Sequence, residues 1–145
     1  MLFGGKKRRR IERLLLVEDE PLVAFDNEHF LRTEGFEIVA TVDSVSDALR
    51  VIDEEEEIDL LLVDVSLSDG SGIEVAYAAH GRGITVVFVT GNCPGEAKSF
   101  AAGCLSKPYA QRDLLAAIDA VEAVIEGTKV PRRLPGGFSL FGMGA

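Results

Sequence analysis

The stretch Asp59-Leu60-Leu61-Leu62-Val63-Asp64 decides the fold, because a strand with no polar residue on either face ends at a carboxylate. Such a strand is typical of the centre of a parallel sheet that helices cover on both sides. The carboxyl ends of parallel strands lie along one edge of the sheet, so residues that follow these strands should converge on one crevice. Three more mainly apolar runs end in the same way: residues 14–17 at Glu18 and Asp19, residues 86–89 at Thr90, and residues 104–106 at Lys107.

Strand and helix signals alternate on both sides of this stretch. Strands are expected over residues 14–17, 36–42, 60–63, 84–89 and 104–106. Helices are expected over residues 21–34, 44–57, 73–79, 94–102 and 114–125. Five strands alternating with five helices predict an α/β fold with right-handed crossovers and a doubly wound parallel sheet.

The length and composition are those of one small globular domain. The chain has 145 residues, of which 47% are hydrophobic, and no apolar stretch approaches the roughly 20 residues of a membrane-spanning helix. The basic residues 6–10 resemble the start of a signal peptide, but Glu12 and Arg13 interrupt the apolar run after them. We therefore expect a cytoplasmic protein with no membrane contact, in which Cys93 and Cys104 are reduced thiols.

Charge separates an acidic body from two basic ends. Residues 1–13 carry a net charge of +5 and residues 127–145 carry +3, whereas the whole chain carries −9, which leaves −17 on the residues between them. A body this acidic repels a nucleic-acid backbone and disfavours nucleic acid as a partner. The Gly- and Pro-rich C-terminal end predicts a flexible tail, in which Phe138, Leu140 and Phe141 are more apolar than a spacer needs and should dock on the body or on a partner.

The acidic residues of the expected crevice indicate a metal ion. Glu18, Asp19 and Asp64 would place like charges a few ångströms apart, which either keeps one carboxyl protonated or requires a cation. Carboxylate oxygens with room for water suit Mg²⁺ better than a full Ca²⁺ cage. With Thr90 and Lys107 added, the set indicates metal-assisted chemistry on a phosphoryl group. A single polar residue at a strand end could merely mark where the chain leaves the core, but four strands ending in this way argue against that interpretation.

The motifs Val17-Glu18-Asp19-Glu20-Pro21, residues 59–67, Thr90 and Lys107-Pro108 are similar in order and spacing to those of receiver domains of bacterial two-component response regulators. The resemblance covers about residues 12–126, which leaves residues 1–11 as a basic tail and residues 127–145 as a flexible one. It implies a flavodoxin-like fold with five helices and five parallel strands in the order 2-1-3-4-5.

The resemblance also implies a role for each residue of the crevice. Asp64 would accept a phosphoryl group from a sensor histidine kinase, and Thr90 and Lys107 would bind the phosphoryl oxygens. Asp19, Asp64 and the backbone carbonyl of Ser66 would hold Mg²⁺, with Glu18 acting through a bound water. A carboxylate is a weak nucleophile, but in-line attack on phosphorus needs mainly positioning and charge neutralisation. The protein would not be an enzyme with a separate substrate, since it would catalyse its own phosphotransfer and autodephosphorylation.

One position departs from the common receiver pattern, and two depart from the motif of a receiver subgroup. Receivers that drive a DNA-binding output usually carry an aromatic residue three positions before the lysine, where this chain has Cys104. Together with Phe88-Val89-Thr90-Gly91, this resembles single-domain receivers that carry a Phe-Ala-Thr-Gly motif, several of which serve general-stress and sensory kinases. Val89 replaces the alanine of that motif, and Asn92 replaces the residue that usually follows it.

The function expected from the sequence is that of a single-domain response regulator acting as a phosphate sink or as an adaptor for a downstream protein. No Gly-x-x-x-x-Gly-Lys-Ser/Thr loop is present to support an NTPase. Ser66 stands where a phosphatase that forms an aspartyl-phosphate would carry a second aspartate. A protein-binding module that works without phosphorylation is the remaining alternative.

Overall fold

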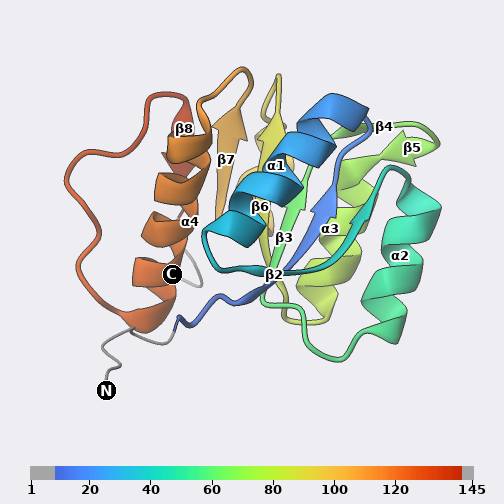
Figure 1. Ribbon diagram of the computed structural model, residues 1–145, viewed down its shortest axis with the longest axis horizontal. Helices are drawn as coiled ribbons and strands as arrows, with labels where there is room; N and C mark the ends of the chain where they lie inside the picture. The colour runs from blue at the N-terminus through green and yellow to red at the C-terminus, as the bar shows by residue number, and fades with distance from the viewer. Residues whose placement is uncertain (1–8, 142–145) are drawn as a thin grey trace.

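Five parallel strands form the centre of the computed structural model, which describes residues 9–141 (Figure 1). Across the sheet they lie in the order β2 (Glu37–Val42), β1 (Arg13–Val17), β3 (Leu60–Val63), β6 (Thr85–Thr90) and β7 (Gly103–Ser106). All four pairings between neighbours are parallel, and this order is the expected 2-1-3-4-5. The apolar strand β3 is fully buried at the centre, as its sequence predicts.

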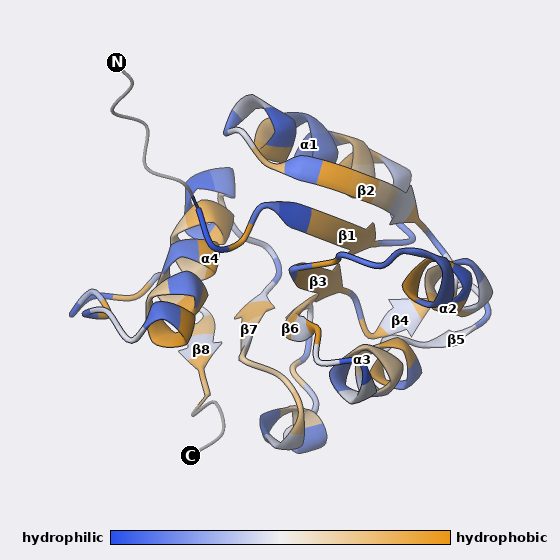
Figure 2. Cartoon of the chain, turned by 90° about the horizontal axis from the view of Figure 1, so that it is seen from below, coloured by the Kyte–Doolittle hydropathy of each residue, from blue (hydrophilic) through white to orange (hydrophobic). Residues whose placement is uncertain are grey.

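Two pairs of helices cover the two faces of this sheet (Figure 2). Helices α1 (Pro21–Thr33) and α4 (Gln111–Glu126) lie on one face, and α2 (Val45–Glu54) and α3 (Gly72–Gly81) lie on the other. Each face encloses its own apolar core, because alternate residues of the buried strands point to opposite sides. Leu14 and Leu16 belong to the first core, and Leu15 and Val17 to the second.

The prediction of a helix over residues 94–102 is wrong. This segment holds only the 3-10 turn η1 (Gly95–Ser99), so the described residues contain four α-helices and not five. Ala97 is the single buried side chain of that turn. A helix with so small an apolar face gains little from packing against the sheet, which is the main source of stability for a short helix.

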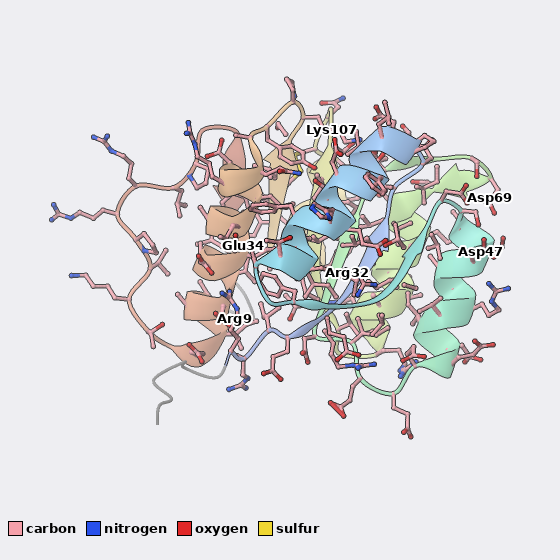
Figure 3. All side chains as sticks on the ribbon, in the orientation of Figure 1. Arg9, Arg32, Glu34, Asp47, Asp69 and Lys107 are labelled. Carbon is pink, nitrogen blue, oxygen red and sulfur yellow. A yellow bond between two sulfur atoms is a disulfide. The ribbon has the colours of Figure 1, made fainter. Side chains whose placement is uncertain are left out.

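A short hairpin follows β3 where the sequence predicts only a loop. Its strands are β4 (Ser66–Leu67) and β5 (Gly70–Ser71), and Asp69 lies at its tip. The Asp69 carboxylate accepts the backbone N–H groups of Val45 at 2.6 Å and Ser46 at 3.1 Å, beside the start of α2 (Figure 3). These backbone hydrogen bonds lower the pKa of Asp69. The hairpin is therefore attached to a helix N-terminus, which favours negative charge.

Residues 138–140 depart from the expected flexible tail. They form β8 (Phe138–Leu140), which pairs antiparallel with β7 and adds a sixth strand to the sheet. Phe138 is buried in the core beneath α4, and Leu140 and Phe141 pack against the two cores, so the expected docking on the body is confirmed. Gly103 makes room for this strand, since a Cβ there would lie 2.7 Å from the Ser139 carbonyl oxygen and 2.8 Å from the Phe138 ring. Residues 142–145 lie outside the described part of the chain.

The prediction that residues 1–11 form a tail is also wrong for the last residues of that range. Ile11 is buried, and its N–H donates to Glu122 of α4 at 2.8 Å. The Arg9 guanidinium lies 2.6 Å from Asp119 and 3.1 Å from Glu122, and it stacks over the Phe36 ring. Acidic residues on α4 therefore hold the end of the basic run. Residues 1–8 lie outside the described range.

Cys93 and Cys104 are joined in a disulfide, which corrects the expectation of reduced thiols. Cys104 lies in β7, and Cys93 lies in the loop that follows the neighbouring strand β6. This pairing of strands brings the two Cα atoms to 6.2 Å, within the range that a disulfide spans. The two cysteines are 11 positions apart in the sequence, and no local sequence pattern indicates that they are close in space.

No α-helix in residues 9–141 combines the length and the apolar character that crossing a membrane requires.

Phe138→Ala should lower the free energy of unfolding by about 3 kcal/mol, because it leaves a cavity in the core beneath α4. Ser139→Ala is the matched control, since Ser139 lies in the same strand with an exposed side chain and should change stability by less than about 0.5 kcal/mol. Urea unfolding of both variants measures the difference. If the two variants lowered the free energy of unfolding equally, burial of the Phe138 side chain would not be how β8 stabilises the fold.

Candidate functional site

The residues expected at the strand ends meet at one edge of the sheet. Glu18 and Asp19 follow β1, Asp64 follows β3, Thr90 ends β6 and Lys107 follows β7. Asp19, Asp64, Thr90 and Lys107 line a cavity of about 580 Å³, and Glu18 contacts Lys107 beside it, so the strand ends converge on one crevice as predicted. The residues lining it are Asp19, Glu20, Asp64, Val65, Ser66, Thr90, Gly91, Asn92 and Lys107.

Four carboxylates gather beside this cavity. Oxygen atoms of Glu18, Asp19, Glu20 and Asp64 all lie within 4.8 Å of one another. Glu18 is 7% exposed and Asp64 is 6% exposed, whereas Asp19 is half-buried and Glu20 is exposed. The backbone positions the two buried residues, because the Glu18 N–H donates to Val42 and the Asp64 N–H donates to Val17 in continuation of the strand pairing.

Lys107 is the cation of this cluster. Its Nζ atom lies 2.8 Å from a carboxylate oxygen of each of Glu18, Glu20 and Asp64, which confirms that it points into the crevice. The Lys107 N–H donates to the Thr90 carbonyl oxygen at 2.8 Å, so the lysine and the threonine are held together through their backbones. In Figure 3 Lys107 lies at the upper edge of the molecule, near the first turns of α1.

The charges of this cluster shift the pKa values of its members. Burial raises the pKa of Glu18, although hydrogen bonds from Lys107 and from the Glu20 N–H oppose that rise. Burial alone would lower the pKa of Lys107, but its hydrogen bonds to Asp64, Glu18 and Glu20 together raise the pKa above its ordinary value. Lys107 therefore stays protonated at neutral pH.

The cluster fits a hard divalent cation. Four carboxylates face one ammonium group, so an uncompensated negative charge remains in a small volume. Carboxylate oxygens are the ligands that Mg²⁺ prefers. Ser66 also lines the cavity, as its expected role as a carbonyl ligand requires, and its N–H donates to Asp64 Oδ1 at 3.3 Å.

Two side chains near the site were not predicted from the sequence. Glu20 contacts Lys107, and the uninterrupted acidic run from Glu18 to Glu20 was the available signal. The Tyr109 hydroxyl accepts a hydrogen bond from Asn27 of α1 at 2.8 Å, and burial raises the pKa of Tyr109. No sequence signal links two residues 82 positions apart.

The chain is similar in sequence to known proteins. The family model of the response regulator receiver domain matches residues 14–119. The phyllosphere-induced regulator PhyR of Methylorubrum extorquens is 33% identical over 58 residues, which cover 40% of this chain and 22% of PhyR. The cell cycle transcriptional regulator CtrA of Caulobacter vibrioides is 29% identical over 116 residues, which cover 75% of this chain and 49% of CtrA. The chain thus spans about half or less of the length of these relatives.

A solved structure agrees with the family match. The receiver domain protein from Methanospirillum hungatei, described as CheY-like, superposes with a TM-score of 0.69 at 28% identity, covering 75% of this chain and 91% of that one. The matched residues include the C-terminal ends of the strands that contribute side chains to the acidic crevice. The chain therefore belongs to the family of response regulator receiver domains.

Proposed function

We propose that this chain accepts a phosphoryl group on Asp64 from a phosphohistidine of a sensor histidine kinase, in a reaction that depends on Mg²⁺. The observation that carries the proposal is the position of Asp64, which is buried at the end of the central strand, 2.8 Å from Lys107 and beside an open cavity. Membership of the receiver family supports phosphoryl acceptance in general, and we propose the role of each individual residue.

The chemistry assigns one task to each residue. An Asp64 oxygen attacks phosphorus while the bond between phosphorus and the donor imidazole nitrogen breaks, and the imidazole keeps that electron pair. Lys107, freed from part of its contact with Asp64, donates to a phosphoryl oxygen. Thr90 donates its hydroxyl hydrogen to another oxygen. Charge neutralisation of this kind is the main requirement for phosphoryl transfer.

The metal would be held by Asp19, Asp64 and the Ser66 carbonyl, with Glu18 acting through a bound water. When bound, Mg²⁺ supplies positive charge that stabilises the phosphoryl oxygens. The contact of Glu18 with Lys107 supports its indirect role, since that carboxylate already has a cationic partner.

The kinase would approach beside α1. The helix exposes Leu22 and Phe25, which are 78% and 69% exposed. A second cavity of about 480 Å³ lies next to the acidic crevice and includes Val23, Lys107 and Tyr109. An apolar patch at the entrance to a charged site is the kind of surface that a protein partner covers.

We further propose that the phosphorylated chain acts as a phosphate sink, or as an adaptor for a downstream protein, in stress or sensory signalling of the Phe-Ala-Thr-Gly receiver type. The exposed short side chains of Ser66 and Asn92 flank the cavity and leave room for water to attack the acyl phosphate. A module that binds proteins without phosphorylation remains the alternative.

Asp64→Asn should abolish Mg²⁺-dependent phosphorylation because it removes the nucleophile. It should leave the fold intact because it removes one of several crowded negative charges. The measurement is transfer of label from a panel of purified histidine kinases. Asp53→Asn is the control, since Asp53 is exposed near the end of α2 and should not affect labelling. Undiminished labelling of the Asp64 variant would contradict the assignment.

Asp19→Asn should weaken Mg²⁺ binding by at least about tenfold, as expected when a charged ligand is lost. Calorimetric titration with Mg²⁺ measures this affinity without any phosphotransfer. The same Asp53→Asn variant should bind as the unmodified chain does. If Asp19→Asn also bound Mg²⁺ normally, Asp19 would not be a ligand.

A competition experiment separates a sink from an adaptor. The chain is added to a histidine kinase and its output regulator, and label on each protein is followed with time. A sink should draw label away from the regulator and release it quickly as phosphate. Persistent phospho-Asp64 beside an unaffected regulator would overturn the sink and favour an adaptor.

A further inference from the structure

The disulfide lies between the two residues proposed to bind the phosphoryl group. Cys93 comes three residues after Thr90, and Cys104 comes three residues before Lys107. Thr90 and Ser106 face each other across the paired strands β6 and β7, and the Thr90 carbonyl accepts the Lys107 N–H. The bond therefore closes the segment 93–104, which lies in the sequence between Thr90 and Lys107.

Residues 91–95, which lead into the segment that the bond closes, have few other attachments. Gly91 and Asn92 line the acidic crevice and are exposed. Around the turn the backbone hydrogen bonds are local, from Ala97 to Pro94 and from Phe100 and Ala101 to Ala97, and a bond to another strand, from Ala102 to Val86, comes only near the end of the segment. Ala97 and Ala101 are buried, but they lie in the later part of the segment. The position of residues 91–95 thus depends strongly on the Cys93 link.

The two cysteines differ in their exposure. Cys104 is completely buried, whereas Cys93 is half-buried in the loop. A dithiol reductant would therefore meet the Cys93 sulfur first. Cys104 lies in the core beside Phe88 and Ala97, where a free thiol packs as a small apolar group. The body of the fold can accommodate both oxidation states.

We propose that Cys93 and Cys104 form a reversible thiol–disulfide switch that controls how the loop after β6 adapts to a phosphoryl group. This inference rests on the proposed function of Asp64. In the disulfide form Gly91 and Asn92 are held in place beside Thr90. In the dithiol form Cys93 is released and the loop can close over the phosphoryl group, so the reduced protein holds that group more tightly.

The redox step is a thiol–disulfide exchange with a dithiol. A thiolate of the reductant attacks the Cys93 sulfur, the bond to Cys104 breaks, and the Cys104 thiolate takes a proton. The second thiol of the reductant then displaces Cys93 and forms the reductant's own disulfide. Two electrons pass to the protein, and the reverse reaction with a disulfide oxidant restores the bond.

The test uses the full chain equilibrated in buffers of reduced and oxidised dithiothreitol. Alkylation followed by mass spectrometry counts the free thiols, and calorimetry measures binding of beryllofluoride, a phosphoryl mimic, in the presence of Mg²⁺. We expect the oxidised form to bind the mimic at least about fivefold more weakly than the reduced form. Because coupling is reciprocal, saturating beryllofluoride should favour the reduced form by the same factor.

Cys93→Ser provides the matched variant, since it removes the accessible sulfur and leaves Cys104 in the core. It should bind beryllofluoride as the reduced form does in both buffers. Equal affinity of the two forms, or a redox response that persists in Cys93→Ser, would overturn the switch.

Hydrogen exchange separates the switch from the proposed function, because it needs no phosphoryl group. Reduction should speed exchange at the Ala97 amide by about tenfold, because that amide donates to the Pro94 carbonyl in the released stretch. The amides of Phe100 and Ala101, which donate to the Ala97 carbonyl, should change less. Unchanged exchange would overturn the switch even in a protein that binds beryllofluoride. Faster exchange on reduction in a protein that binds no beryllofluoride would support the loop release and contradict the function of Asp64.

Discussion

The contact of one ammonium group with three carboxylates constrains the rest of this structure. Lys107 Nζ lies 2.8 Å from Glu18, Glu20 and Asp64, and Glu18 and Asp64 are both buried. The two buried carboxylates need this cation beside them, since a buried charge without a partner is costly. The parallel sheet meets this requirement because it ends β1, β3 and β7 at the same edge.

The strand that leads to Lys107 is restrained on both sides. On its inner side the Lys107 N–H donates to Thr90, and the disulfide joins Cys104 to the loop after β6. On its outer side β8 pairs with it, and the Ser106 N–H donates to Gly137 at 2.9 Å. The chain segment after α4 therefore helps to fix the position of Lys107.

Much of the fold and the convergence of the site residues could be predicted from the sequence. A fully apolar run such as residues 60–63 predicts a strand that is buried on both faces. Parallel strands also place their C-terminal residues at one edge of the sheet, independently of the conformation of the loops. The predictions that were wrong concern contacts that local patterns do not carry. Strand β8 depends on the missing side chain of Gly103, the disulfide on the adjacency of β6 and β7, and the docking of Arg9 on acidic residues more than 100 positions away.

The central claim is that this cluster prepares Asp64 to become an acyl phosphate. Borohydride reduces an aspartyl phosphate to homoserine, so peptide mapping by mass spectrometry after phosphorylation and reduction identifies the modified residue directly. The account predicts homoserine at position 64 and at no other acidic residue. Homoserine at Asp19 or at another carboxylate, with position 64 unchanged, would contradict it.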